Sequence, residues 1–234
     1  MQLSKWLLLD CMKLPEIRNT LKQARFFLEC RGRRKHDATS GDLRNNGEYW
    51  QDHLPAVQQR EAVGHAVRAL YFYSGMADIA FHMVDKDYLE AVDGIWDNIV
   101  GKKMYLTGGL GSTAHNEAFG KNYELPNATA YCETCASIAN CMFNLRMFRL
   151  HGEAKYFDVL ERSLYNTVLS GISLSGDQFF YPNVLEADRR GTKNVACGLG
   201  CSCCPTNLSR FIPAIPGYVY ATDEHAIYTN LFIS

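Results

Sequence analysis

The sequence has no long hydrophobic run and almost no excess of charge of either sign. No apolar stretch in its 234 residues reaches the ~18 residues of a membrane-spanning helix, so we expect no membrane partner. The 24 Lys and Arg nearly balance the 25 Asp and Glu, so the charge pattern of a nucleic-acid-binding protein is missing. The one basic run, RGRRKH (31–36), follows a helix-like segment, and we predict that it is a solvated loop.

The opening segment MQLSKWLLLDCMKL also lacks the features of an export signal. Asp10 interrupts its apolar stretch, and no small-residue cleavage site follows. We therefore expect a cytoplasmic location for this chain.

Cysteine, by contrast, is abundant, with nine residues. An odd number leaves one thiol over in a pure disulfide framework, and a chain with 47% hydrophobic residues needs no disulfide staples. Five of the thiols form two clusters, YCETC (131–135) and CSCC (201–204), which favours metal ligands. The others are predicted to be small buried apolar residues, namely Cys11, Cys30, Cys141 and Cys197.

The first two thirds of the chain have a helical pattern. Apolar residues recur at three- and four-residue spacing over 15–32, 59–81, 86–100, 132–152 and 154–171. The stretches 20–28, 88–96 and 156–164 begin 68 residues apart, and their apolar residues coincide at three places. This recurrence predicts repeated helical hairpins of the kind that stack in a ring or superhelix.

The pattern changes after Gly171, where loops and short strands are expected. Strand-like alternation on both sides of TDEH (222–225) predicts a β-hairpin. Because a two-stranded hairpin alone is marginally stable, we interpret 213–234 as the start of a truncated β-domain and 1–212 as a partial helical domain. The chain is then an internal piece of a longer protein, and its uncovered helix faces predict self-association into homo-oligomers.

Two zinc sites are compatible with the spacing of the thiols. One is an all-cysteine site that combines Cys132 and Cys135 with the second cluster. The other uses Glu133, Cys135, Cys203 and Cys204, and four negative ligands would leave one thiolate electron-rich enough to act as a nucleophile. Glu117, in a polar Gly-rich loop, is a candidate acid-base partner, although composition alone favours an exposed surface glutamate.

Long motifs, in order along nearly the whole chain, resemble glycoside hydrolase family 127, whose best-known members are β-L-arabinofuranosidases. The motifs are EAVGHAVRALYFYSGMADIA, YLTGGLGS, NEAFGKNYELPNATAYCETCASIANCMFNLRMF, KYFDVLERSLYNTVLSGISLSGDQFFYPNVLE and CSCCPTN. The resemblance implies an all-α catalytic domain, here a partial (α/α)6-barrel or toroid, followed by the start of a C-terminal β-sandwich. It also implies bound Zn²⁺ and retaining cleavage of terminal β-L-arabinofuranosyl linkages in oligosaccharides or glycoprotein glycans.

The same resemblance implies a role for each matching residue. Cys203 would be the nucleophile and a zinc ligand, with Glu133, Cys135 and Cys204 as the other ligands, and Glu117 would be the general acid/base. His65, Tyr181 and Glu161 would bind the sugar. From their positions alone, His65 and Tyr181 would be ordinary helix-face and loop aromatics. Cys201 receives no role.

Alternatives remain open at this point. Family members mostly carry Asn where this chain has Cys132, which keeps the all-cysteine zinc site in play, with Glu133 displaced. The N-terminal half of the expected barrel is missing, so the chain could be a catalytically inactive zinc-binding fragment. A zinc toroid such as a lanthionine-forming cyclase would need a histidine ligand, and a CxxC redox protein would need a βα setting; both are disfavoured.

Overall fold

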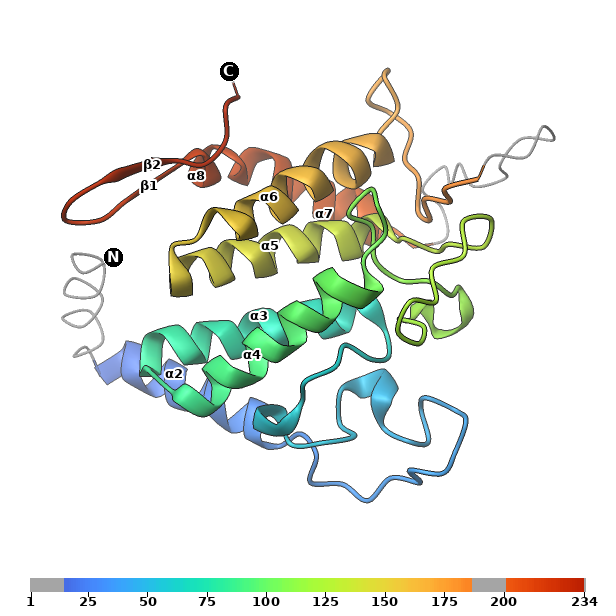
Figure 1. Ribbon diagram of the computed structural model, residues 1–234, viewed down its shortest axis with the longest axis vertical. Coiled ribbons are helices and arrows are strands. Elements are labelled where there is room, and N and C mark those ends of the chain that lie inside the picture. Colours follow the sequence, from blue (N-terminus) through green and yellow to red (C-terminus); the bar gives the residue numbers. More distant parts are fainter. Residues whose placement is uncertain (1–14, 187–200, 234) are drawn as a thin grey trace.

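The computed structural model describes residues 15–186 and 201–233 as a layered arrangement of antiparallel helices with one small β-hairpin (Figure 1). The main helices are α2 (Pro15–Glu29), α3 (Ala66–Met83), α4 (Lys86–Asn98), α5 (Thr134–His151), α6 (Ala154–Ser163), α7 (Cys203–Phe211) and the short α8 (Pro216–Val219). Strands β1 (Tyr220–Thr222) and β2 (Ile227–Thr229) pair antiparallel. Within these ranges no helix combines the length and the apolar character needed to cross a membrane.

The predicted repeat of helical hairpins is confirmed by the helix bounds. Both ends of α5 lie 68 residues after the ends of α3, and α6 begins 68 residues after α4. The hairpin turns match too, because Val84 after α3 and Gly152 after α5 both have left-handed backbone conformations, with φ of 54° and 73°. Asp85 then caps α4 by accepting hydrogen bonds from the N–H groups of Asp87 and Tyr88.

The core lies between the two hairpins. α5 packs against α3 on one side and against α6 and α7 on the other, so most of its residues are buried. A chain of buried polar contacts runs through this core: Trp96 Nε1 donates to Asn144 Oδ1 (2.8 Å), Asn144 Nδ2 to Asn140 Oδ1 (2.9 Å), and Asn140 Nδ2 to Ser163 Oγ (3.0 Å). Since each buried polar group has a partner, the chain fixes how α4, α5 and α6 pack.

Several predicted helix ends are wrong. The first helix ends at Glu29, three residues before the predicted end, and Cys30 beyond it is exposed rather than buried. The helix expected from residue 59 begins only at Ala66, because Gly64 (φ 71°) turns the chain where a Cβ would meet the Glu48 carbonyl oxygen at 2.0 Å. Cys141 is buried as expected, whereas Cys11 and Cys197 lie outside the described residues. The basic run 31–36 is the expected loop.

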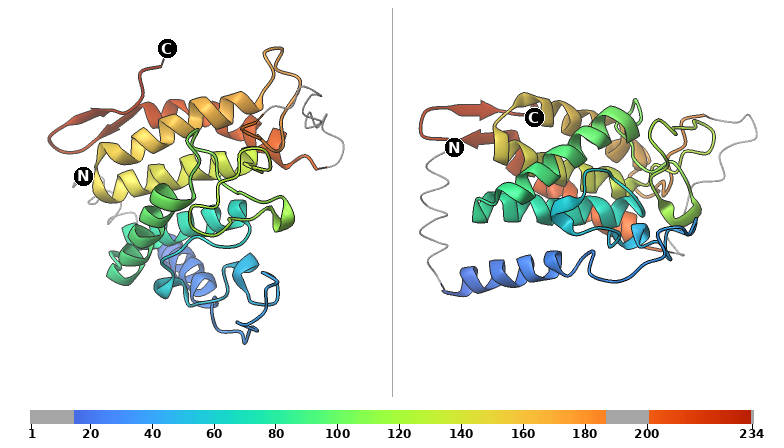
Figure 2. Two further views of the ribbon diagram at one scale, coloured as in Figure 1. Left: turned by 45° about the vertical axis from the view of Figure 1, so that its right-hand side comes forward. Right: turned by 60° about the horizontal axis from the view of Figure 1, so that its bottom comes forward.

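Two further differences concern the C-terminal third. The helices expected to reach residues 100 and 171 change from α- to π-helical turns, at Ile99–Lys103 and Leu164–Val168. The sequence analysis did not anticipate α7, although Cys204, Leu208 and Phe211 are buried on one side of it at helical spacing. The β-hairpin is confirmed, and it lies beside the turn between α5 and α6, where Tyr228 packs on Phe148 with ring centroids 5.9 Å apart (Figure 2).

The alternating direction of the helices separates the connections into two groups. The short turns between α3 and α4 and between α5 and α6 lie at the left in Figure 1, with the hairpin. The long connections that precede α3, α5 and α7 gather at the opposite end. The N-termini of α3, α5 and α7 therefore face the same group of loops.

Candidate active site and metal centre

The predicted site residues come from the N-termini of three helices. His65 is the N-cap residue of α3, Glu133 is the N-cap residue of α5, and Cys203 is the first residue of α7. These starts follow the 68-residue repeat, so the fold brings together segments that are far apart in sequence. The positive ends of three helix dipoles point into this region and favour anionic groups such as thiolates and carboxylates.

Four ligand atoms form a compact cluster. One atom each from Glu133, Cys135, Cys203 and Cys204 lies within 4.8 Å of the others. The Cys135 and Cys204 sulfurs are 3.3 Å apart, and both Cys203 and Cys204 sulfurs are 3.6 Å from Glu133 Oε1. This is the ligand set that the family resemblance implied.

The dimensions and chemistry of this cluster fit a zinc ion. Zn–S bonds of about 2.3 Å in a tetrahedral site place sulfurs about 3.8 Å apart, close to the 3.9 Å between Cys203 and Cys204. Glu133 Oε2 is buried without a hydrogen-bond partner among the described residues, as expected for an oxygen that awaits a cation. Three thiols and one carboxylate form a donor set that suits Zn²⁺.

The electrostatics of the cluster point the same way. Burial, with the nearby Cys135 thiolate, raises the pKa of Glu133 to about 9. Burial also raises the pKa of Cys203 to about 12. The hydrogen bond between the Cys135 and Cys204 sulfurs lowers the pKa of Cys135 and raises that of Cys204. The site thus resists gathering negative charge by itself, and a divalent cation would remove that penalty.

Cys132 is not part of the cluster, so the all-cysteine alternative is wrong. Its buried side chain packs with Tyr105 and Ala130, and a Cβ on Gly109 would lie 2.9 Å from its sulfur. The backbone of Cys132 has a φ of 40°, which turns its side chain away from that of Glu133. Burial raises the pKa of this thiol to about 12, as expected for an inert structural cysteine. Cys201 is exposed and is not one of the clustered ligands either.

Glu117 faces the same region from a turn in the loop before α5. Asn116 and Glu117 have φ values of 59° and 51°, an uncommon left-handed conformation for two successive non-glycine residues. The Glu117 side chain is one-third exposed, and its Oε2 lies 2.9 Å from Nε2 of His65. Burial lowers the pKa of His65, which favours the neutral imidazole. Oxygens of Glu117 and Glu133 and a ring nitrogen of His65 lie within 4.8 Å of one another.

A cleft of about 830 Å³ connects these groups. His65, Glu117 and Tyr181 line it together with the metal cluster, and the Cys203 sulfur lies 3.2 Å from the Tyr181 hydroxyl. Glu161, the third residue expected to bind the sugar, is partly exposed on α6 and is not among the residues that line the cleft. Its role stays a prediction.

The sequence analysis missed several residues of this cleft. Arg68, Tyr71, Asn207 and Arg210 line it, and Tyr131 reaches Glu117 directly. The spacing of His65, Arg68 and Tyr71 places them on one face of α3, a signal that was available once His65 was chosen. For Tyr131 the sequence offered no comparable signal.

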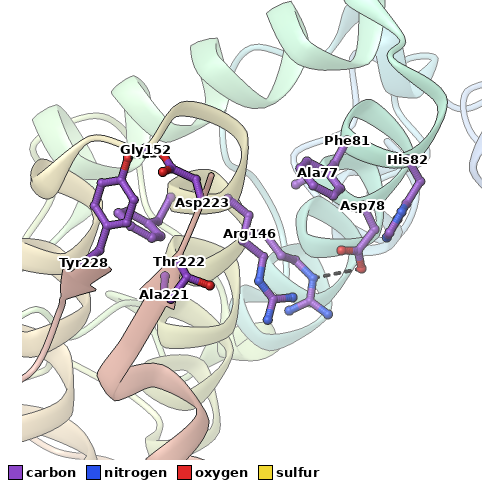
Figure 3. Close-up of a pocket in the computed structure, with 12 residues that line it drawn as sticks. Ala77, Asp78, Phe81, His82, Arg146, Gly152, Ala221, Thr222, Asp223 and Tyr228 are labelled. Atoms are coloured by element: carbon purple, nitrogen blue, oxygen red, sulfur yellow. Dashed lines mark hydrogen bonds and ion pairs between the residues drawn. The ribbon is translucent and has the colours of Figure 1, made fainter. Parts of the chain in front are cut away.

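A second pocket, of about 380 Å³, lies at the other end of the helices, beside the β-hairpin (Figure 3). Asp78 and Arg146 form an ion pair of 2.8 Å in its wall, and Phe81, Tyr228 and Ala221 supply apolar surface. None of the predicted site residues lines it, so it plays no part in the candidate active site.

Residues 18–217 match the family described as β-L-arabinofuranosidase, GH127 catalytic domain. A non-reducing end β-L-arabinofuranosidase from Bifidobacterium longum subsp. longum is 40% identical over 185 residues, 75% of this chain and 28% of that protein. The chain therefore belongs to the GH127 β-L-arabinofuranosidase catalytic-domain family.

Solved structures agree with this assignment. The GH127 β-arabinofuranosidase BT3674 is 51% identical with a TM-score of 0.84, over 98% of this chain and 34% of that one. The GH127 β-L-arabinofuranosidase Ara127N from Geobacillus stearothermophilus T6 is 37% identical with a TM-score of 0.82, over 97% of this chain and 39% of that one. The described helical fold is thus a GH127 fold, and the chain spans roughly a third of the length of these relatives.

Proposed function

We propose that this chain carries the catalytic centre of a retaining glycoside hydrolase that removes terminal β-L-arabinofuranosyl groups. The observation that carries the proposal is the meeting of Cys203, its candidate metal cluster and Glu117 in one cleft of a GH127 fold. A nucleophile and an acid/base are the two groups that retaining hydrolysis needs.

The architecture proposed for residues 1–212 is part of an (α/α)6-barrel, with 213–234 as the start of a β-sandwich. Two helical hairpins related by the 68-residue repeat, followed by α7 and then the β1–β2 hairpin, support this division. Because inner helices of such a barrel share one direction, the long connections at one end provide the catalytic groups.

In the first step, protonated Glu117 donates its proton to the oxygen of the leaving group. The Cys203 thiolate attacks the anomeric carbon, so a carbon–sulfur bond forms as the glycosidic carbon–oxygen bond breaks. In the second step, the Glu117 carboxylate takes a proton from water, the resulting nucleophile attacks the same carbon, and the Cys203 thiolate leaves. Two displacements on one carbon retain its configuration.

Glu133, Cys135, Cys203 and Cys204 would hold the Zn²⁺ ion. When bound, zinc compensates the negative charge of these ligands and keeps the thiols deprotonated. Among the remaining residues of the cleft, His65 and Tyr181 are placed to bind sugar hydroxyls, and His65 also holds Oε2 of Glu117. The substrate class proposed is an L-arabinofuranosyl-containing oligosaccharide or glycoprotein glycan.

The second candidate function is a zinc-binding fragment without activity. It is favoured by the length of the chain, which covers only 28–39% of its relatives. Both candidates predict the same metal cluster, so only turnover separates them.

The test combines zinc content with release of p-nitrophenol from p-nitrophenyl β-L-arabinofuranoside. One zinc per chain, with turnover that is abolished in Cys203→Ser and unchanged in Glu153→Gln, would support the hydrolase; Glu153 is an exposed residue at the opposite end of the helices. One zinc without turnover in the unmodified chain would favour the inactive fragment. A chain that binds no zinc would refute the site in both forms.

A further inference from the structure

We propose that Tyr131 is a positioning residue that holds the carboxyl group of Glu117 in place for proton transfer to the leaving group. The inference rests on the proposed role of Glu117 as acid/base. Tyr131 directly precedes Cys132 and the ligand Glu133, and its hydroxyl donates a hydrogen bond of 3.1 Å to Glu117 Oε1.

Glu117 needs such a partner because little else fixes its carboxyl group. Its backbone follows a left-handed turn in a loop, and its side chain is one-third exposed. The strand-like contacts of this loop begin one residue later, where Ala118 N–H donates to the Thr113 carbonyl and Phe119 N–H to the Gly64 carbonyl. Of the two carboxyl oxygens, Oε2 lies beside His65 and Oε1 accepts from Tyr131. Without Tyr131, one half of the carboxyl group is free to rotate.

Tyr131 is itself held firmly. Its N–H donates to the Gly111 carbonyl (3.2 Å), and its carbonyl accepts from the Asn183 N–H (2.9 Å). The φ of 40° at Cys132 then reverses the side-chain direction, so that Tyr131 faces Glu117 while Glu133 faces the thiols. A strained residue between two functional ones is the pattern expected where tertiary structure enforces a site geometry.

The ring of Tyr131 also links the two catalytic groups. It packs against the ring of Tyr181, with centroids 6.1 Å apart and planes tilted by 58°. The Tyr181 hydroxyl in turn lies 3.2 Å from the Cys203 sulfur. The two tyrosines therefore hold the acid/base on one side and the nucleophile on the other, and their contact fixes one relative to the other.

A hydroxyl group suits this task for a chemical reason. Glu117 must be a carboxylic acid in the first step and a carboxylate in the second. A tyrosine hydroxyl can accept a hydrogen bond from the acid and donate one to the carboxylate, whereas an ammonium or guanidinium group can only donate. Tyr131 can therefore stay bonded to Glu117 through both steps.

The experiment compares Tyr131→Phe with the unmodified chain on two substrates that differ in the need for an acid. p-Nitrophenolate leaves readily without protonation, whereas the alkoxide of a methyl β-L-arabinofuranoside does not. Since general acid catalysis contributes about 10²–10⁴-fold, we expect kcat/KM to fall at least about 10-fold for the methyl glycoside and less than about 3-fold for the p-nitrophenyl glycoside.

Tyr105→Phe is the matched control, because Tyr105 is a buried tyrosine whose hydroxyl donates to the Pro126 carbonyl, outside the cleft. It should change both substrates equally. Equal losses on both substrates in Tyr131→Phe would show a merely structural role and overturn the proposal. In a Glu117→Gln background, Tyr131→Phe should cause no further loss; an additive loss would also overturn it.

A measurement without turnover separates this proposal from the proposed function. If the unmodified chain hydrolyses neither substrate, the hydrolase proposal fails for this chain, and carbodiimide labelling of Glu117, followed by peptide mapping, decides the role of Tyr131. Labelling should be faster in Tyr131→Phe than in the unmodified chain and in Tyr105→Phe. Equal rates in all three would refute the contact between Tyr131 and Glu117.

Discussion

The sulfur of Cys203 lies 3.2 Å from the hydroxyl oxygen of Tyr181, a residue 22 positions earlier in the chain. The thiol at the start of α7 is thereby tied to the loop that follows α6. Burial raises the pKa of Cys203 to about 12, and the Tyr181 hydroxyl acts against this by donating to the thiolate.

The first prediction follows from that contact. In metal-free protein at pH 8, Tyr181→Phe should slow the alkylation of Cys203 by iodoacetamide, because the thiolate loses a donor and becomes a smaller fraction of the total. Mass spectrometry of the labelled peptides measures the rate. The exposed Cys30 in the same sample serves as the internal reference and should react as before. Unchanged or faster alkylation of Cys203 would contradict the role given to Tyr181.

The second prediction concerns which residues hold the metal. Glu133→Gln should weaken zinc binding by more than the roughly 10–100-fold that follows from losing a partner of a ligand, because a ligand itself is lost. Cys132→Ser and Cys201→Ser should leave the affinity unchanged, since neither thiol belongs to the cluster. Competition with a chromophoric chelator measures all three. Loss of zinc in Cys132→Ser would revive the all-cysteine site.

The third prediction tests the turn after α3. Val84 is 72% exposed and adopts a left-handed conformation, which costs a non-glycine residue roughly 1–2 kcal/mol. Glycine avoids that cost but loses about 0.5–1 kcal/mol of backbone entropy, so Val84→Gly should stabilise the protein by up to about 1 kcal/mol.

Thermal unfolding provides the measurement, with Tm expected to rise by a few degrees at most, about 2–4 °C per kcal/mol in a chain of this size. The reciprocal change at the equivalent position, Gly152→Val, should lower Tm. A fall in Tm for Val84→Gly would mean that contacts of the valine side chain outweigh its backbone strain.

The fourth prediction concerns acid stability. Burial lowers the pKa of His53, and its Nδ1 is buried without a hydrogen-bond partner among the described residues. The unfolded chain takes up this proton near pH 6.5, whereas the folded chain does so only at lower pH. The unfolded state therefore holds more protons in this window, and stability falls as pH falls below about 6.5.

Urea unfolding at pH 7.5 and pH 5.5 measures this effect. His53→Gln should reduce the difference in unfolding free energy between the two pH values, because the titrating group is gone. Replacement of the exposed His225 by Gln is the control and should leave the difference as it was. If His53→Gln leaves the difference unchanged, the acid sensitivity arises at other groups, such as His65 and His82, whose pKa values burial also lowers.

Much of the helical framework was predictable because it depends on local patterns. Apolar spacing located α3 to α6, and the 68-residue recurrence identified the hairpins before any contact was known. The failures have local causes as well. Gly64 delays the start of α3, and the CSCC run hides α7, since its buried side combines Cys204 with Leu208 and Phe211 rather than a run of large apolar residues.

The sequence by itself determined the chemistry that this protein has available: thiols in two clusters, a glutamate between two cysteines, and helices that repeat at a fixed interval. Only the tertiary structure decided which of these groups meet. It excludes Cys132 from the metal cluster through one left-handed residue, joins Cys135 to Cys204 across 69 positions, and brings Tyr131 to Glu117. Residue types follow from the sequence, whereas distances between side chains on different helices depend on how those helices pack.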